Sequence, residues 1–311
     1  MARSSVITVG SFDGVHLAHR ALIAEARRLA TDRGAAEVVV LAFREHPLTF
    51  LKPQAAPPRL MDADQRMAAL LEAGADRVQW LEPDASLLHL DPGQFVERVV
   101  EQLHPVGWVE GPDFRFGRGR AGDVQTLQAM GLQSGFAVRV VEPIQVVLRD
   151  KSTCRVSSSL VRWLVGEGRM SDAALCLGRP FAVRGQVVKG DQRGQTIGFP
   201  TANLEATGRQ LPADGVYAGT VTIDGTDYTA AVSVGVKPTF GDAPRAFEAF
   251  ITDFRGDLYG KTLEVKVLRW LREQWPFPSA DALVQQMNRD VDHIRRLALA
   301  GLLDPATTVA V

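Results

Sequence analysis

The sequence has few cysteines, no excess of either charge and no long hydrophobic run. Cys154 and Cys176 are the two cysteines in 311 residues, which excludes a disulfide framework or a four-cysteine zinc cluster and fits a reducing compartment. Lysine and arginine number 35 and aspartate and glutamate 36, and this balance argues against nucleic acid or an anionic membrane as a partner. The longest apolar run, residues 38–43, is far too short to span a membrane, and the N-terminal residues have no apolar stretch of signal-peptide length. We therefore expect a cytoplasmic protein.

The composition supports two folded domains. Hydrophobic residues make up 46% of the chain, charged residues 23% and aromatic residues 7%, which is ordinary for a globular protein and excludes wholesale disorder. A chain of 311 residues is long enough for about two domains, each with its own core.

In the first half, short apolar runs alternate with helical patterns, as in a parallel sheet covered by helices. Asp62 and Asp91 are expected to cap helices, because a glutamine follows each of them three residues later. The last helical pattern ends at Gly178, and Pro180 cannot continue it. We expect strands at 6–9, 37–43, 106–109 and 137–141, and helices at 17–29, 62–71, 95–103 and 160–177. The pattern predicts a doubly wound, Rossmann-like α/β domain over residues 1–179.

In the second half, the hydrophobic period changes to that of antiparallel strands. Asp224-Gly225 is the signal for a type I′ hairpin, which would place Val221 opposite Tyr228. Several short strands with glycine-rich turns favour a small β-barrel. Ser279 is expected to cap a closing amphipathic helix. The second predicted domain, residues 180–311, is therefore an antiparallel barrel with a C-terminal helix.

A candidate phosphate site lies in residues 8–20, TVGSFDGVHLAHR. A strand leads through a glycine turn to His16 and His19 at the start of a helix, where backbone amides and imidazole groups together favour an anion. The alternative is a capped helix with two partly exposed histidines. A zinc site is less favoured, because His46 is the one further candidate ligand nearby and lies in another loop.

A second group of polar residues stands near the end of the first half. Ser157, Ser158 and Ser159 precede a helix that carries Arg162 one turn later. Hydroxyl groups, free amides and a guanidinium at a helix start suit the outer phosphates of a nucleotide. The alternative is that the serines only cap the helix.

A third group lies in residues 188–204, VKGDQRGQTIGFPTANL. Glycines allow backbone amides to approach phosphates, and Thr201 and Asn203 offer neutral oxygen ligands to Mg²⁺. Ordinary barrel turns are the alternative. The glycines and the adjoining proline are Gly190, Gly194, Gly198 and Pro200.

Four motifs of the first half resemble a known family in order and spacing. GSFDGVHLAHR and SSSLVR are similar to the G-x-F-D-G-V-H-x-G-H and S-S-T-x-I-R signatures of the FMN adenylyltransferase module of prokaryotic bifunctional FAD synthetases. FREHP, residues 43–47, and GPDFRFGRGRAG, residues 111–122, resemble two motifs that lie between them. The resemblance covers nearly all of residues 5–180.

This resemblance implies that the phosphate of FMN attacks the α-phosphorus of ATP and that pyrophosphate leaves, without a covalent enzyme intermediate. His16 and His19 would stabilise the transition state, and Arg162 would act on the leaving phosphates together with Ser157, Ser158 and Ser159. The implied ATP pocket is formed by Gly10, Phe12, Asp13 and Gly14, and the implied flavin side by Asp113, Phe114 and Phe116. For Phe114 and Phe116 a place in the core is an equal alternative.

The second half resembles riboflavin kinase through GQTIGFPTANL, with agreement in GVYAG, VGVKPTFG, FEAF and DLYGK. In that family the residue matching Glu248 accepts the proton of the riboflavin 5′-hydroxyl as it attacks the γ-phosphate of ATP. A solvent-facing glutamate is the alternative for Glu248. The implied substrates and products are ATP, riboflavin, FMN and FAD, with Thr201 and Asn203 as ligands of Mg²⁺.

Some positions depart from these patterns, and they keep other hypotheses open. Ser11, Ala18, Glu45 and Ser159 stand where the adenylyltransferase usually has Asn, Gly, Pro and Thr, and Phe250 stands where many kinases have His. A working kinase joined to a weakened adenylyltransferase is therefore a second hypothesis. A regulatory protein that binds flavin or nucleotide without turnover is a third, against which the retained Glu248 argues. The oligomeric state stays open, a homo-oligomer included.

Overall fold

The computed structural model describes residues 4–190, 194, 197–236 and 245–303, which form two compact units. Unit 1 comprises Met1–Pro57, Asp62–Val146 and Thr153–Ser158. Unit 2 comprises Pro58–Met61, Val147–Ser152 and Ser159–Val311.

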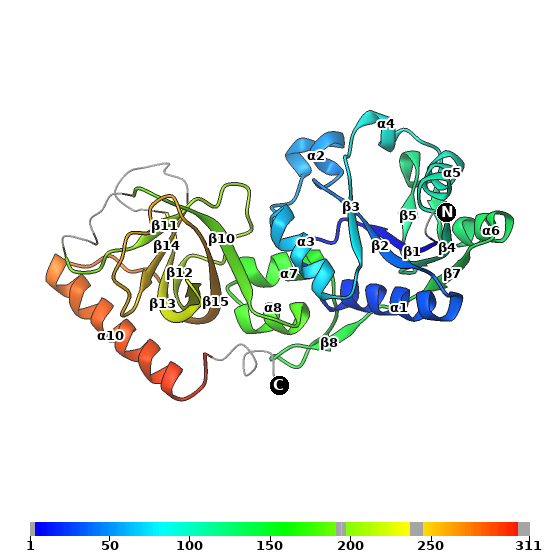
Figure 1. Cartoon of the computed structure of the whole chain (residues 1–311). Coiled ribbons are helices and arrows are strands. Elements are labelled where there is room, and N and C mark those ends of the chain that lie inside the picture. Colours follow the sequence, from blue (N-terminus) through cyan, green and yellow to red (C-terminus); the bar gives the residue numbers. More distant parts are fainter. Residues whose placement is uncertain (1–3, 191–193, 195–196, 237–244, 304–311) are drawn as a thin grey trace. The chain divides into compact units, whose positions relative to one another are not determined.

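Unit 1 is built on a five-stranded parallel sheet with the strand order β3-β2-β1-β4-β7 (Figure 1). The order reverses between β1 and β4, so the connections from these two strands run in opposite directions. In such sheets, ligands bind at the carboxyl ends of the strands beside this switch point. The strands are β1 (Ser5–Gly10), β2 (Glu37–Phe43), β3 (Arg77–Leu81), β4 (Pro105–Glu110) and β7 (Ala137–Val140).

Alternate residues of the strands face two helical layers. Val6, Val38 and Val109 pack against α1 (Leu17–Arg33) on one face. Their neighbours in the sequence pack against α5 (Pro92–Leu103) and α6 (Val124–Ser134) on the other face (Figure 1). The doubly wound α/β prediction is confirmed.

The predicted helix starts are also confirmed. Asp62 caps α3 (Ala63–Glu72) and Asp91 caps α5, each in a full capping box with the glutamine three residues later. The structure adds β3, which the sequence analysis did not predict, because every residue of this edge strand is half-buried and no fully apolar run marks it.

The remaining elements before the barrel are short. They are α2 (Leu48–Leu51), η1 (Pro53–Ala55), α4 (Ala85–Leu88), β5 (Arg115–Phe116), η2 (Arg118–Arg120), β6 (Gly122–Asp123), β8 (Gln145–Val147), β9 (Thr153–Arg155), α7 (Ser158–Gly166) and α8 (Met170–Leu177). Helix α8 ends at Gly178, which has a left-handed backbone (φ 71°), as its place before Arg179-Pro180 predicts.

Unit 2 contains a closed antiparallel barrel with the strand order β10-β11-β14-β13-β12-β15. Val221 lies opposite Tyr228, and both Asp224 and Gly225 have positive φ, so the predicted type I′ hairpin and its register are confirmed. Part of the PTAN segment, considered above as a turn, is strand. The strands are β10 (Phe181–Val188), β11 (Ala202–Leu204), β12 (Gly215–Ile223), β13 (Thr226–Gly235), β14 (Ala246–Ile251) and β15 (Thr262–Arg272).

The long helix α10 (Ala280–Leu299) packs against the outside of this barrel (Figure 1). Ser279 caps it by accepting a hydrogen bond from the backbone N–H of Ala282, as predicted. Ile294 is fully buried against Ala218 and Leu268. Within the described residues, the helices are too short or too polar to cross a membrane.

Candidate active sites

The loop between β1 and α1 has a strained backbone. Phe12 and Val15 have positive φ values of 49° and 39°, which are rare for residues other than glycine and especially so for a β-branched one. Gly14 also has a positive φ, of 86°. Strain of this kind is maintained only when the surrounding structure fixes it, and it concentrates at functional sites. Gly10 ends β1, and residues 12–15 are buried. The loop is therefore packed into the structure at the carboxyl end of the sheet.

His16 and His19 lie side by side at the start of α1. Their rings stack at 3.6 Å between centroids, and the ring of Phe12 lies 5.0 Å from that of His19. His16 is only 4% exposed and caps the helix, with its Nδ1 accepting a hydrogen bond from the His19 backbone N–H at 3.4 Å. The cap of the capped-helix interpretation is therefore present, although His16 is buried where that interpretation had it partly exposed. The cap is compatible with a phosphate site, because an imidazole that accepts at Nδ1 keeps its proton on Nε2 and can donate from there.

The first and last motifs of unit 1 meet at Ser158. Its hydroxyl donates a hydrogen bond to the backbone carbonyl of Asp13 at 2.7 Å, and Ser157 beside it is half-buried. Ser159 and Arg162 belong to unit 2, where the Arg162 guanidinium donates from Nε to the Pro58 carbonyl at 2.8 Å. The helix α7 begins at Ser158, so the serines also stand at a helix start as predicted.

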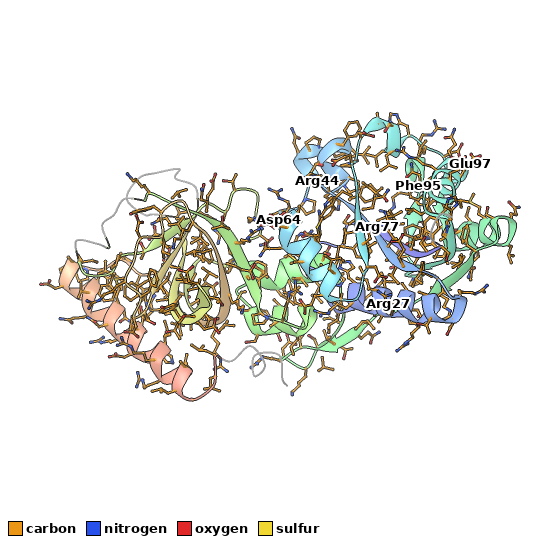
Figure 2. The ribbon with its side chains drawn as sticks, in the orientation of Figure 1. Arg27, Arg44, Asp64, Arg77, Phe95 and Glu97 are labelled. Atoms are coloured by element: carbon orange, nitrogen blue, oxygen red, sulfur yellow. The ribbon has the colours of Figure 1, made fainter. Side chains whose placement is uncertain are left out.

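Phe116 lies in the core of unit 1, where its ring is 5.9 Å from that of Phe95. Phe95 points from α5 toward the sheet (Figure 2). Phe114 is half-buried and stacks on Phe116 at 5.3 Å, and Asp113 is exposed and pairs with Arg155. The core interpretation is correct for Phe116, whereas Phe114 lies at the edge of the core.

Two buried charged groups near the first motif were missed by the sequence analysis. Arg66 on α3 is 5% exposed, and Glu110 at the end of β4 is 2% exposed. The signal for Arg66 was its position: it shares the buried face of α3 with Ala69 and Leu70, three and four residues later. Glu110 carried no comparable signal beyond ending an apolar run.

Glu110 links the ends of β1 and β4 at the switch point. The β1–β4 ladder runs only to the pair Ile7–Trp108, and beyond it Glu110 Oε1 accepts hydrogen bonds from the Val9 backbone N–H (2.7 Å) and the Trp108 indole N–H (2.9 Å). Burial raises the pKa of the Glu110 carboxyl well above its usual range, although both hydrogen bonds act in the opposite direction. Burial therefore favours the protonated form of this carboxyl.

In unit 2, three of the predicted site residues share one face of a strand pair. Asn203 on β11 lies directly opposite Glu248 on β14, and Thr201 precedes Asn203 by two residues. The Thr201 hydroxyl is 3.5 Å from Glu248 Oε2. Residues far apart in the sequence are thus brought together, as the kinase resemblance implies.

The strand pair β11–β14 separates two cavities. Ala249 and Ile251 line one cavity of about 360 Å³, and Glu248 and Phe250 line another of about 280 Å³. Thr201 lines both. Because successive residues of a strand point to opposite faces, β14 presents a carboxylate to one cavity and an apolar wall to the other.

The glycine-rich segment lies beside these cavities. A Cβ at Gly190 would stand 2.5 Å from Asn203 Oδ1, and a Cβ at Gly194 would meet the Phe199 carbonyl oxygen, so neither position accepts a side chain without movement. Gly198 has a positive φ of 84°, and Pro200 lines the larger cavity. Residues 191–193, 195–196 and 237–241, which belong to quoted motifs, lie outside the described residues.

A partly buried ion pair that the sequence analysis did not predict also lines the smaller cavity. Arg272 on β15 pairs with Asp290 on α10 through three hydrogen bonds of 2.7–3.1 Å. The Arg272 guanidinium also lies 5.7 Å from the rings of Trp275 and Phe277. These two rings line a further cavity of about 790 Å³ that shares Glu248 and Arg272 with the smaller one. A continuous aromatic and apolar space therefore extends from Glu248.

No group of three or more His, Cys, Asp or Glu side chains is placed to hold a metal ion in the part of the chain that the structure describes. Thr201 and Asn203 fit a different kind of site. They are neutral oxygen donors beside glycines, which suits a Mg²⁺ ion that keeps several waters and phosphate ligands.

Comparisons with known proteins agree with the two units. Residues 1–159 match the family model of FAD synthetase, and residues 177–298 match that of riboflavin kinase. Bifunctional riboflavin kinase/FMN adenylyltransferases of Pseudomonas fluorescens and Escherichia coli K12 are 38% and 34% identical, over 95% and 97% of this chain and 94% of each relative.

Among solved structures, one described as a macrolide-efflux protein from Streptococcus pneumoniae matches with a TM-score of 0.84 and 30% identity over 95% of each chain. Two family models in the expected order and curated relatives aligned over almost their whole length lead to one assignment. The chain belongs to the family of bifunctional riboflavin kinase/FMN adenylyltransferases.

Proposed function

We infer that this chain makes FAD from riboflavin in two steps, each of which consumes ATP. Riboflavin is phosphorylated to FMN, and FMN is then adenylylated to FAD with release of pyrophosphate. The observation that carries this conclusion is the presence of both family matches in one chain, each over a separate fold with its own group of site residues.

In the kinase reaction we assign Glu248 as the general base. The flavin would occupy the smaller cavity and the aromatic space that continues from it, and the nucleotide would occupy the larger cavity on the other side of β14. The riboflavin 5′-oxygen attacks the γ-phosphorus of ATP, the bond from that phosphorus to the ADP oxygen breaks, and the hydroxyl proton passes to the Glu248 carboxylate.

Thr201 and Asn203 are the proposed Mg²⁺ ligands in this reaction. A bound Mg²⁺ would neutralise charge on the phosphates of ATP. Their positions opposite and beside Glu248 on one face of the barrel support the assignment, because phosphate and base must meet at the same hydroxyl group. The amides of the segment containing Gly190, Gly194 and Gly198 are proposed to contact the phosphates.

In the adenylyltransferase reaction we assign the loop after β1 and the two histidines. A phosphate oxygen of FMN attacks the α-phosphorus of ATP, and the bond to the pyrophosphate oxygen breaks. The attacking group is already an anion, so no base is needed. His16 and His19 would donate hydrogen bonds to charge that develops in the transition state, near the amides that begin α1.

Other residues of unit 1 keep the roles that the resemblance gives them. Gly10, Phe12, Asp13 and Gly14 are proposed to shape the ATP pocket, and Asp113 and Phe114 to face the flavin, with Phe116 supporting Phe114 from the core. Ser157 and Ser158 are proposed as phosphate ligands, and the assignments of Ser159 and Arg162 stay predictions.

Product analysis tests the function most directly. Purified protein incubated with riboflavin, excess ATP and Mg²⁺ should form FMN first and FAD later, as separated by chromatography. FMN that accumulates without FAD would refute the bifunctional assignment in favour of a kinase with a weakened adenylyltransferase. Unchanged riboflavin would favour the regulatory binding protein.

The domain boundary at Pro180 and a cytoplasmic location remain proposals. A fragment of residues 180–311 that folds and phosphorylates riboflavin would support the boundary. A fragment of residues 159–311 is the sharper comparison, because seven of the eight residues of α8 are buried and the helix contacts β10 and β15. If circular dichroism shows that the shorter fragment is unfolded and the longer one is folded, the boundary would move to residue 159.

A further inference from the structure

Arg66 is a buried cation that none of the reactions above employs. Its side chain comes from α3, and 5% of the residue is exposed. Burying a guanidinium is costly unless its N–H groups are hydrogen-bonded, so its contacts identify what it holds in place.

Two of these contacts join separate motifs of the adenylyltransferase. One terminal nitrogen donates to the Ser11 carbonyl at 2.8 Å, in the strained loop after β1. The other donates to the Arg44 carbonyl at 2.5 Å, in the FREHP loop after β2 (Figure 2 labels Arg44 and, on α3, Asp64). One side chain therefore joins the loops at the carboxyl ends of two adjacent parallel strands.

A third contact reaches the next strand of the sheet. The Arg66 guanidinium lies 4.8 Å from the centre of the Trp80 ring on β3. Because the strand order is β3-β2-β1, these three contacts lie next to one another along the sheet. They lie toward the carboxyl ends of the strands, where nucleotides bind in such sheets.

The shape of the guanidinium matters here. Its planar fork presents N–H groups in two fixed directions, so it can hold two carbonyl oxygens at once, whereas the ammonium of lysine is a single centre on a flexible stem. The loop that it holds at Ser11 contains Phe12 and Val15 with positive φ, and such backbone needs fixed neighbours.

We propose that Arg66 is a positioning residue of the FMN adenylyltransferase, which fixes the loop that leads to His16 against the loop after β2. The proposal rests on the adenylyltransferase activity proposed above. Arg66 contacts loop carbonyls, so its effect on the reaction passes through the geometry of the loop.

The test compares Arg66→Ala and Arg66→Lys with wild type in full-length protein, using initial rates of FAD formation from supplied FMN and ATP and of FMN formation from riboflavin. We expect kcat for FAD formation to fall about 10²-fold in both variants, the loss typical of a small misplacement of reacting groups, while KM for ATP changes less. Riboflavin phosphorylation should keep its wild-type rate. Arg98→Ala, an exposed arginine of α5, is the matched control and should alter neither rate.

Chemical rescue separates positioning from a general loss of structure. Methylguanidinium, added well below denaturing concentrations, should restore FAD formation by folded Arg66→Ala, and methylammonium should not. Wild-type FAD formation by either variant would overturn the proposal, as would a folded Arg66→Ala that methylguanidinium does not rescue. If Arg66→Ala fails to fold, Arg66→Lys decides alone, with a lowered kcat supporting the proposal. Wild-type protein that makes no FAD would instead refute the proposed function.

Discussion

In unit 1, His16 is 4% exposed and is fixed by a strained loop and a helix start, whereas in unit 2, Glu248 is half-buried on a regular strand between two cavities. The first arrangement depends on buried groups brought in from elsewhere in the chain, such as Arg66 and Glu110. The second follows from strand register, because Asn203 and Glu248 face the same way once β11 and β14 pair. We therefore expect the activity of unit 1 to fall when residues behind its site are substituted. The activity of unit 2 should fall mainly when the site residues themselves are substituted.

The largest expected effect is at Glu248. Glu248→Gln removes proton acceptance but keeps the size of the side chain, so riboflavin phosphorylation should fall by about 10²- to 10⁴-fold. FAD formation from supplied FMN should be unchanged, because that reaction needs no base. Paired initial rates measure both. Glu264→Gln, an exposed glutamate on β15, is the control and should leave both rates at wild type. Phosphorylation that persists in Glu248→Gln would mean that another group takes the proton.

His16 should show the reverse pattern. His16→Ala removes a positioned donor and the cap of α1, so FAD formation should fall by about 10²- to 10³-fold, while phosphorylation stays at wild type. His89→Ala, at an exposed histidine after α4, controls for loss of an imidazole. If His16→Ala lowers both rates in a folded protein, the two sites are not independent.

The smallest effect is on stability and concerns Glu110. Because burial raises the pKa of this carboxyl, the folded state keeps its proton at pH values where the unfolded chain has lost it. The contribution of this protonated carboxyl to the free energy of unfolding is thus complete below its pKa in the unfolded chain, about 4.3. It is lost as the pH rises toward the raised pKa of the folded state. Glu110→Gln keeps an acceptor but cannot ionise, so its stability relative to wild type should rise with pH over this range.

Urea unfolding of unit 1 within the full-length protein, recorded at several pH values between about 5 and 8, measures this difference in the free energy of unfolding. Glu110→Leu is the companion variant. It leaves the Val9 and Trp108 N–H groups without their acceptor and should cost about 1–3 kcal/mol for each donor. A stability difference between wild type and Glu110→Gln that does not change with pH would show that Glu110 is ionised in the folded protein.

Local signals were enough to predict much of this structure. The Asp224-Gly225 turn fixes the register of β12 and β13, and Asp62 and Asp91 mark their helix starts, because each signal acts within a few residues. The spacing of His16 and His19 likewise predicted that they lie close together. Thr201 and Glu248, by contrast, were assigned to one site through the family resemblance.

Other features depend on contacts that no local pattern contains. Arg66 bonds to a carbonyl 55 positions away, and Glu110 bonds to an amide 101 positions away, so only the strand order reveals what they hold. The edge strand β3 is a different case, since RVQWL alternates polar and apolar residues over a few positions, a short local signal that the sequence analysis did not use. The ion pair of Arg272 with Asp290 appears only when α10 is placed on the barrel.

The closure of the barrel has a consequence for how the chain matures during synthesis. Its first strand pairs with its last, with Phe181 of β10 opposite Val267 of β15, so strand edges stay open until residues 262–272 have been made. In unit 1, by contrast, β1 can pair with β2 as soon as Phe43 is available. Open edges are templates for aggregation. A ribosome that stalls between residues 251 and 262 would therefore release a chain with all of unit 1 joined to an aggregation-prone sheet.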